Sequence, residues 1–332
     1  MVTNNHRKVL RRANQGVLRN FKWFVEERHR VYLRRHKGLP QDEWTSDRVL
    51  ANQAFCNAFR VLDRGSQFVL TDLDLENQPT QIALLRVAAY RFTNQPSLWR
   101  WIHRELGYQL EEEDIESGEL ASLLDQAESQ GRSIFRPAYL ISFGRESKLS
   151  NRQESLMSLL DNFRYGSLAQ RAFLNAGSLE ERMQALQDQV PRVGRFMAQQ
   201  IATDMNYFPQ HALGTENDHV LPGPGSLRGL SLLFGAPARG KELSEDFRSM
   251  LEALQAYLHH SETAPQLFPG RSVRRLSLMD LQNCLCEFSK YMKYSARAAS
   301  DPLKYAQKKP YRALATLPGP VLPAHWADES PI

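Results

Sequence analysis

The sequence predicts a mainly α-helical protein. Apolar residues recur at the spacing of a helix face along most of the chain, as Phe21, Val25 and Tyr32 do near its start. The sequence shows no alternation of strands with helices and no internal repeat. Its 332 residues, 42% hydrophobic and 24% charged, have the composition of a globular protein. This length is enough for one large domain or two fused ones.

The predicted helices follow from this periodicity and from end signals. The first starts near Leu18 and ends before Gly38-Leu39-Pro40, and Arg28 lies on its apolar stripe, so that side chain should point inward. The second is expected from about Asp47 to Arg64. The other helices are expected over 80–92, from 96 onward, and over 118–130, 152–163, 167–176, 178–191, 194–207, 244–260 and 277–297.

Two segments lack a clear helical pattern. Residues 134–143 are compatible with a strand or a helix, although Pro137 argues against a central strand. The tail from Asp301 contains six of the 17 prolines and should be irregular. We therefore expect a basic N-terminal arm over 1–20, a helical domain of two lobes over 21–300, and a proline-rich tail over 301–332.

Positive charge is concentrated at the start of the chain. The formal net charge is +5, but residues 1–37 contain eleven Lys and Arg and only two Glu, so the rest of the chain is slightly acidic. Trp23, Phe24 and Tyr32 are interleaved with these cations. Cations with aromatic faces between them are typical of a surface that binds a polyanion. A solvated basic helix without a partner is the alternative.

Several classes of protein are disfavoured. No run approaches the ~18 apolar residues of a membrane span, and the start of the chain is no secretory signal. Three cysteines are too few for a disulfide framework, which favours a reducing cytoplasm. No P-loop, G-x-G-x-x-G or H-E-x-x-H motif occurs. Cys284 and Cys286 point different ways from a helix and cannot ligate one zinc ion, while Cys56 is typical of a small core residue rather than a nucleophile.

Asn57, Arg60 and Asp63 are spaced three apart on the second predicted helix. At ~100° per residue they lie together beside an apolar stripe, at the edge of a core. Arg60 and Asp63 can pair, which would fix the guanidinium for bidentate binding of a phosphate. A surface ion pair of little energetic value is the alternative.

The hexapeptide Leu221-Pro222-Gly223-Pro224-Gly225-Ser226 predicts a tight hairpin with exposed backbone N–H groups before a helix. Such a turn suits a phosphate oxygen and is typical of helix-hairpin-helix elements, which hold the DNA backbone. DNA contacts are therefore expected at Leu221, Gly223, Gly225, Ser226 and Arg228. An ordinary Gly/Pro loop is the alternative.

Further functional side chains lie on two later helices. Glu287, Lys290 and Tyr291, with Asn283 and Tyr294, line a face beside the apolar stripe of the 277–297 helix. Asp204 borders an apolar stripe and Asp218 follows in the next loop. Burial of Asp204 would raise its pKa toward that of a general base. An acid held by a nearby Arg is the alternative.

Six runs of the sequence, taken in order, resemble a known family. They are F-V-E-E-R-H-R-V-Y-L-R-R-H-K-G-L-P, W-T-S-D, F-C-N-A-F-R-V-L-D-R, V-G-R-F-M-A-Q-Q-I-A-T-D-M, L-P-G-P-G-S-L-R-G-L and L-C-E-F-S-K-Y. The chain resembles the helical proteins encoded beside phage 5-hydroxymethyluracil DNA kinases, named α-glutamyl/putrescinyl thymine pyrophosphorylases or amino-acid:DNA transferases. The similarity covers about residues 20–295.

The resemblance implies a fold similar to the helix-hairpin-helix DNA glycosylases, in an enzyme that acts on thymine carrying a 5-hydroxymethyl pyrophosphate in phage DNA. An amine, often of an amino acid such as glycine, displaces the pyrophosphate. The expected partners are double-stranded DNA with this modified thymine and the amine, in the cytoplasm of an infected bacterium. No cofactor is expected. Assistance of pyrophosphate departure by a divalent metal is left open, although no site for one is evident.

One departure from the glycosylases bears on the reaction. Their essential Asp has no clear match after the hairpin, where Glu242, Glu245 and Asp246 occur. Substitution at the exocyclic carbon therefore fits better than cleavage of the base–sugar bond. A glycosylase-like hydrolase and a non-catalytic DNA-binding protein are the alternatives.

The reaction implied by the resemblance suggests roles for these residues. The base must be flipped out of the duplex. The departing pyrophosphate carries about three negative charges, so Arg28 and Arg60 are expected to bind it. Asp63 is expected to orient Arg60, Asn57 to hydrogen-bond base or phosphate, and Asp204 or Asp218 to take the proton of the amine. Glu287, Lys290 and Tyr291 are expected to recognise the amino acid or the base.

Overall fold

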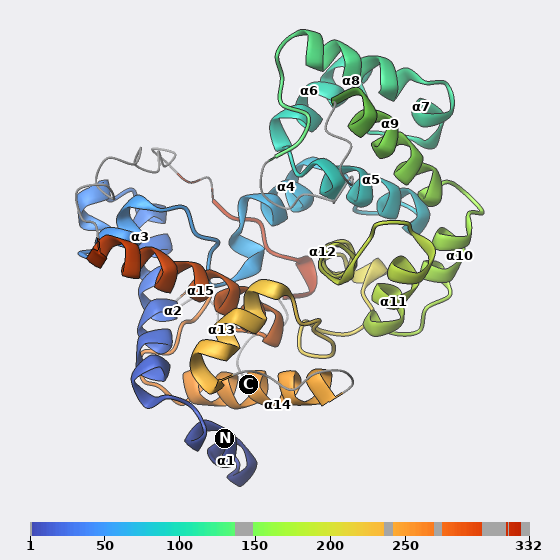
Figure 1. The fold of residues 1–332 in the computed structure, drawn as a ribbon. Helices are drawn as coiled ribbons and strands as arrows, with labels where there is room; N and C mark the ends of the chain where they lie inside the picture. The colour runs from blue at the N-terminus through green and yellow to red at the C-terminus, as the bar shows by residue number, and fades with distance from the viewer. Residues whose placement is uncertain are drawn as a thin grey trace. The chain divides into compact units, whose positions relative to one another are not determined.

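The computed structural model describes residues 2–136, 149–235, 242–268, 274–300, 317 and 319–326. Within these ranges the chain is mainly helical and forms no strand, and an isolated bridge joins Gln266 and Arg275. The prediction of a mainly α fold is therefore confirmed (Figure 1). No helix in the same ranges has the length and apolar content needed to cross a bilayer.

The chain folds into two compact units. Unit 1 comprises Met1–Asp63, Val220–Pro320 and Asp328–Ile332, and unit 2 comprises Arg64–His219 and Val321–Ala327. The helices of unit 1 are α1 (Asn4–Arg11), α2 (Gln15–His36), α3 (Arg48–Asn52), α13 (Pro224–Phe234), α14 (Glu242–His259) and α15 (Leu278–Ser300). Those of unit 2 are α4 (Arg64–Asp72), α5 (Thr80–Thr93), α6 (Pro96–Leu106), α7 (Glu112–Glu116), α8 (Glu119–Ser129), α9 (Leu149–Leu160), α10 (Leu168–Leu174), α11 (Leu179–Gln189) and α12 (Arg195–Met205).

The start of the chain is helical and is joined to unit 1. α1, which the apolar periodicity did not predict, packs against α14. Asn14 then caps α2, because its side-chain oxygen accepts hydrogen bonds from the N–H groups of Gly16 and Val17. The N–H of Asn14 also donates to the carbonyl of Leu233, at 2.8 Å. Residues 2–20 are thereby tied to α13 and α14.

α15 forms the centre of unit 1. Leu281, Leu285 and Phe288 are fully buried, and the ring of Phe288 lies 5.2 Å from that of Phe21 and 5.7 Å from that of Phe24. α13 lies against the opposite flank of this apolar stripe. The predicted helix over 277–297 thus supplies both a core and a platform for the polar residues beside it.

The prediction of one helix from Asp47 to Arg64 is wrong. α3 ends at Asn52, Gln53 is extended, and only a short 3₁₀ turn, η2 (Arg60–Leu62), follows before Asp63. The reason is tertiary: side chains of α2 and α15 satisfy the backbone groups of residues 55–60, so this segment does not need the internal hydrogen bonds of a helix.

α5 is the buried centre of unit 2, where every residue over 83–93 is enclosed. α12 packs against α5. The ring of Trp326 contacts Tyr207 with centroids 5.8 Å apart, so residues 321–326 of the tail belong to this unit. Of the segment predicted as ambiguous, 134–143, residues 137–143 lie outside the described ranges. So do residues 301–316, 318 and 327–332 of the tail.

Close approach of α13 to α15 requires glycine at two positions. A Cβ at Gly229 would overlap the carbonyl of Leu285, and one at Gly225 would overlap the Sγ of Cys286. We expect Gly229→Ala to lower the free energy of unfolding by about 1–3 kcal/mol, because the two backbones must separate. Chemical denaturation should be compared with Gly16→Ala in the first turn of α2, where a Cβ would meet no atom closer than 3.4 Å. Equal effects of the two substitutions would contradict this packing.

Candidate active site

The loop between α3 and η2 is held by Arg28, which projects from α2 into the interior of unit 1. The guanidinium donates to the carbonyl of Cys56 from Nε (3.0 Å), and from Nη2 to the carbonyl of Phe55 (2.9 Å) and to Asn57 Oδ1 (2.8 Å). Arg28 is buried, as its place on the apolar stripe predicts. Desolvation by burial lowers its pKa, while the charge of Asp63 opposes this change.

α15 holds the other side of the same loop with two carboxylates. Glu287 Oε2 accepts the N–H of Cys56 at 3.0 Å, and Asp280 Oδ1 accepts the N–H of Arg60 at 2.7 Å. Asp280 Oδ2 also accepts from the N–H and the hydroxyl of Ser277, at 2.9 Å each, which caps the start of α15. The backbone over residues 55–60 is therefore fixed from two helices.

Asp63 ends this loop as a partly buried carboxylate. Its Oδ1 accepts the N–H of Asn57 at 2.7 Å, while the Asn57 amide donates to the carbonyl of Leu62, also at 2.7 Å. Burial raises the pKa of Asp63 from 3.8 to about 6, against the opposing effects of the Asn57 hydrogen bond and the charge of Arg28, and Glu287 adds to the rise. A carboxyl group with this pKa can exchange protons near neutral pH.

Lys290 and Tyr291 complete the cluster from the next turn of α15. Lys290 Nζ lies 2.9 Å from Glu287 Oε2 and 4.7 Å from the centre of the Phe55 ring. The Tyr291 hydroxyl donates to Asp47 Oδ2 at 3.0 Å, and the other oxygen of Asp47 caps α3. Lys290 is the partly exposed cation of this group.

Seven residues that the sequence pointed to therefore share one region of unit 1: Arg28, Asn57, Arg60, Asp63, Glu287, Lys290 and Tyr291. The sequence argument did not identify Asp47 or Asp280 as residues of this region. Their positions at the starts of helices were the only signal that the sequence offered for them. The spacing of three between Asn57, Arg60 and Asp63 suggested a common helix face, but in the loop their side chains and N–H groups have different partners.

The interior of this cluster has little free space. A cavity beside Arg28 measures about 10 Å³, which is no more than one water molecule needs. Its lining residues are Arg28, Val31, Arg35, Trp44, Leu50, Gln53 and Phe55. A nucleobase cannot enter this cavity, and Phe55, Asn57, Asp63 and Lys290 are the partly exposed residues of the cluster.

Asp204 and Asp218 belong to unit 2. Asp204 is fully buried and forms a two-pronged ion pair with Arg91 of α5, with one N–O distance of 2.8 Å. Asp204 is therefore an acid held by an Arg, which is the alternative to a general base that the sequence left open. Asp218 Oδ2 accepts the N–H of Thr215 at 2.5 Å within its own loop.

The segment predicted as a DNA-binding hairpin packs against α15. Gly223 caps α13, its N–H donates to Ser226 Oγ at 3.0 Å, and that hydroxyl donates back to the Gly223 carbonyl at 2.9 Å. Gly223, Gly225 and Ser226 are buried, and the carbonyl of Leu221 accepts from Gln282 at 3.4 Å. Arg228 is exposed on the next turn. The glycines are thus explained by packing, and an exposed cradle of their N–H groups is not found.

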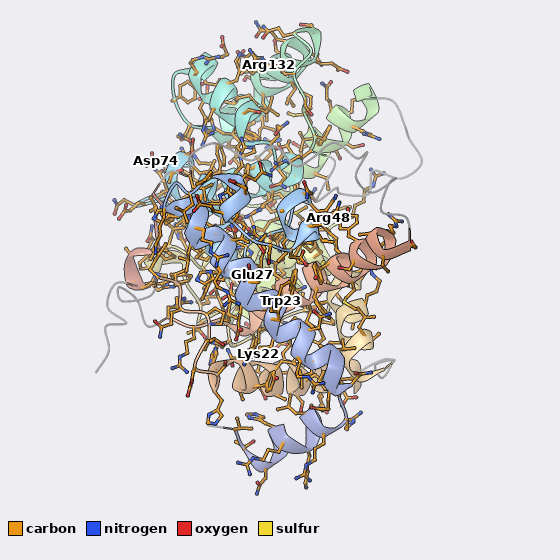
Figure 2. The ribbon with its side chains drawn as sticks, turned by 90° about the vertical axis from the view of Figure 1, so that its left-hand side faces the viewer. Lys22, Trp23, Glu27, Arg48, Asp74 and Arg132 are labelled. Atoms are coloured by element: carbon orange, nitrogen blue, oxygen red, sulfur yellow. The ribbon has the colours of Figure 1, made fainter. Side chains whose placement is uncertain are left out.

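The basic segment presents fewer aromatic faces than its sequence suggests. Phe24 and Tyr32 are only 1% and 4% exposed, whereas Trp23 is 36% exposed beside Lys22 on α2 (Figure 2). The prediction that all three rings serve a binding surface is therefore wrong, because two of them face the core.

No three His, Cys, Asp or Glu of the described ranges are arranged to hold a metal ion. In a comparison with known protein families, a family model described as "5-hmdU DNA kinase, helical domain" matches residues 15–301. Neither the curated proteins nor the solved structures contain a match to this chain.

The Arg91–Asp204 ion pair predicts that Asp204 stabilises the fold, which distinguishes it from a general base. We expect Asp204→Ala to lower the free energy of unfolding by about 3–5 kcal/mol, because it leaves the buried Arg91 charge uncompensated. Glu105→Ala, which breaks the exposed Arg104–Glu105 pair, should cost less than about 1 kcal/mol. A stable Asp204→Ala variant that has lost only activity would instead support Asp204 as a general base.

The raised pKa of Asp63 predicts a pH-dependent stability. Since the folded state binds this proton more tightly than the unfolded chain, the contribution is complete below pH about 4 and is lost as the pH rises through about 6. Asp63→Asn keeps an acceptor for the Asn57 N–H and should remove this contribution. Denaturation of both proteins across that range would detect it, and parallel pH profiles would contradict it.

Proposed function

The chain belongs to the family of 5-hmdU DNA kinase helical domains, and from this premise we propose that it is an enzyme of DNA base modification. The proposed reaction transfers an amine, such as that of glycine, onto 5-pyrophosphoryloxymethyluracil in double-stranded DNA and displaces pyrophosphate. The observation that carries this proposal is the convergence of Asp63, with its pKa of about 6, with Glu287, Lys290 and Arg28 around one loop.

The reaction requires a base and a cationic environment. The amine nitrogen forms a bond to the exocyclic carbon, the bond from that carbon to the pyrophosphate oxygen breaks, and pyrophosphate leaves with the electron pair. The nitrogen must also lose a proton. A general base with a pKa near the working pH serves this step best, and positive charge must face the leaving oxygens.

We assign the role of general base to Asp63. Its second oxygen is not needed for the hydrogen bond from Asn57, and it lies at the partly exposed edge of the site. Asp204, the earlier candidate, is engaged by Arg91 through both of its oxygens. Asp63 is therefore better suited to take the proton than to orient Arg60.

Lys290 is the cation that we assign to the leaving pyrophosphate. It is partly exposed, whereas Arg28 already donates three hydrogen bonds within the protein and Arg60 is buried. Arg28 then acts as a positioning residue for the loop rather than as a direct ligand. Phe55, beneath the Lys290 ammonium, offers an aromatic edge against which the flipped base can lie.

A second candidate function, DNA binding without catalysis, is favoured by the size of the cavity beside Arg28. The chain has no P-loop, so the phosphoryl transfer named in the family description has no recognisable site in this sequence. In this second case the chain would hold DNA for another enzyme. A test of covalent change in the DNA separates the two candidates.

Duplex DNA carrying 5-pyrophosphoryloxymethyluracil, incubated with the full chain and glycine, should release pyrophosphate and yield a nucleoside of new mass. We expect the rate to rise with pH through about 6, as Asp63 loses its proton. Asp63→Asn should lower it about a hundredfold or more. Mass spectrometry of the digested DNA measures the new nucleoside, and a pyrophosphate assay measures the released pyrophosphate.

The matched control is Asp42→Asn, which changes an exposed aspartate of unit 1 away from the loop. It should leave the rate unchanged. If the nucleosides keep their mass and no pyrophosphate is released with any amine tested, the transfer reaction is rejected. DNA binding without catalysis then remains as the function. Abasic sites in the product would point to a glycosylase-like hydrolase instead.

A further inference from the structure

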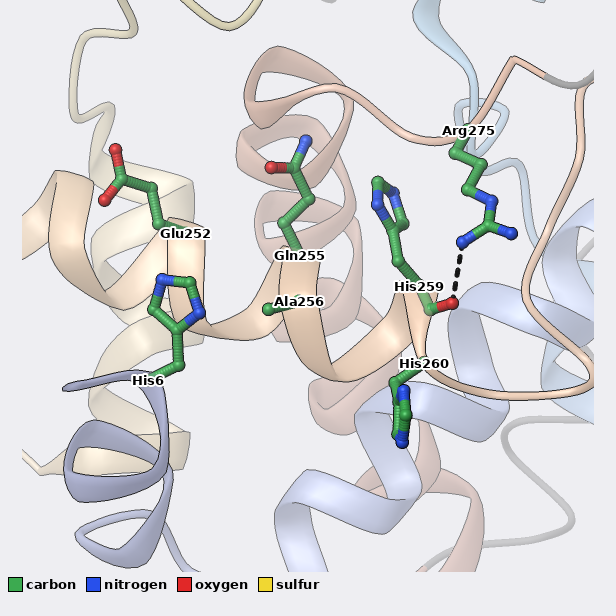
Figure 3. Close-up of a pocket in the computed structure, with 7 residues that line it drawn as sticks. All are labelled: His6, Glu252, Gln255, Ala256, His259, His260 and Arg275. Carbon is green, nitrogen blue, oxygen red and sulfur yellow. Dashed lines mark hydrogen bonds between the residues drawn. The ribbon is translucent and has the colours of Figure 1, made fainter. Parts of the chain in front are cut away.

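A second recess of unit 1 lies apart from the Asp63 loop, between α1 and α14 (Figure 3). Its volume is about 430 Å³, far larger than the cavity beside Arg28. The lining residues are His6, Glu252, Gln255, Ala256, His259, His260 and Arg275. We call this recess the α1–α14 groove.

Two of the lining side chains are held by the fold. Gln255 Nε2 and His259 Nε2 both contact the carbonyl of Leu276, at 2.9 and 3.0 Å. A ring nitrogen beside a carbonyl must carry the proton, and burial lowers the pKa of His259, so this imidazole is neutral near pH 7. His259 is thus part of the wall and not a source of charge.

Two imidazoles, one guanidinium and one carboxylate make up most of the rest of the groove, and His6 Nδ1 accepts the N–H of Thr3 at 3.4 Å. His6 and His260 bring imidazoles from α1 and from the end of α14, and Arg275 brings a guanidinium of which one N–H group binds the carbonyl of His259 at 2.8 Å (Figure 3). Glu252 is the one lining carboxylate, and Arg248 Nε already donates to it at 2.8 Å. A metal ion does not fit this set, because the described residues contain no group of three ligands in suitable positions.

α1, which contributes His6 to the wall of the groove, also carries positive charge. α1 contains no acidic residue, and its neighbourhood within the described ranges places no carboxylate within 4.0 Å of the side chains of Arg7, Lys8, Arg11 or Arg12. All four are exposed. Exposed cations without an ion pair to the described residues, on a helix that lines a recess with N–H donors, are suited to oxygens that carry negative charge.

We propose that the α1–α14 groove binds phosphate, with Arg275 and His260 as direct ligands and the exposed cations of α1 as a further source of positive charge. The proposal rests on the proposed function in one respect, since DNA is the abundant source of phosphate there. Free pyrophosphate offers the same chemistry. In the first case the groove holds the backbone of the DNA strand outside the site of reaction, and in the second it holds the released product.

The test measures binding of a fluorescein-labelled, unmodified duplex to the full chain by anisotropy, over a series of salt concentrations. Arg275→Gln and His260→Gln should each weaken binding about tenfold, because a hydrogen bond to a charged group is lost. Arg275→Gln should also reduce the slope of log K against log salt by about 1. Since His260 is exposed and holds no other element in place, its variant shows the effect even if Arg275→Gln perturbs the end of α14.

The matched control is Arg104→Gln, which removes an exposed cation of α6 in unit 2. It should bind DNA as the unaltered protein does. A second arm measures the thermal midpoint with inorganic pyrophosphate. If pyrophosphate raises the thermal midpoint and both groove variants abolish this rise, the groove binds the free anion. If the midpoint does not rise but the groove variants bind DNA more weakly, the groove binds the strand backbone.

Unchanged DNA affinity, unchanged salt slope and no pyrophosphate effect in either groove variant would overturn the proposal. Because the duplex is unmodified, this result does not depend on the transfer reaction. Loss of binding in the groove variants together with no transfer in any amine assay would reject the proposed function and leave the groove in place.

Discussion

Arg28 carries its charge into the interior of unit 1, where a guanidinium without partners would be very costly. Three of its hydrogen bonds go to two carbonyls and one side chain of residues 55–57. These bonds satisfy Nε and Nη2, while the buried Nη1 has no hydrogen-bond partner among the described residues, and they hold the loop away from a helical conformation. The positions of Asn57 and Asp63, and hence of the candidate base, depend on this one buried cation.

α15 supplies the complementary constraint through its periodicity. Asp280, Asn283, Glu287 and Lys290 follow at intervals of three and four, so they share one face of the helix. The first and third of them accept backbone N–H groups of the loop, and Asn283 donates to the carbonyl of Asn57 at 3.4 Å. Loop and helix are therefore fixed together, with the apolar stripe of α15 buried on the other side.

The sequence predicts the helical class and the inward direction of Arg28, because both follow from local periodicity. It also predicts the polar face of 277–297, since helix geometry alone brings those residues together. The loop over 53–59 could not be predicted, because its partners lie on α2 and α15, far away in the chain. For the same reason Asp204 resembled a base: its partner Arg91 is 113 residues away in sequence.

Charge balance within the site has a consequence for the proposed reaction. Arg28 and Lys290 face Asp63 and Glu287, so the cluster of these four is close to neutral while Asp63 is ionised. A departing pyrophosphate adds negative charge, which such a cluster alone cannot stabilise well. When Asp63 takes the proton of the attacking amine, its own negative charge disappears as that of the leaving group develops. Glu287 is less suited to this role, because its Oε2 already binds both the Cys56 N–H and the Lys290 ammonium. Proton transfer to Asp63 and release of pyrophosphate therefore assist each other, which is why the base belongs inside this cluster and not at a distance from it.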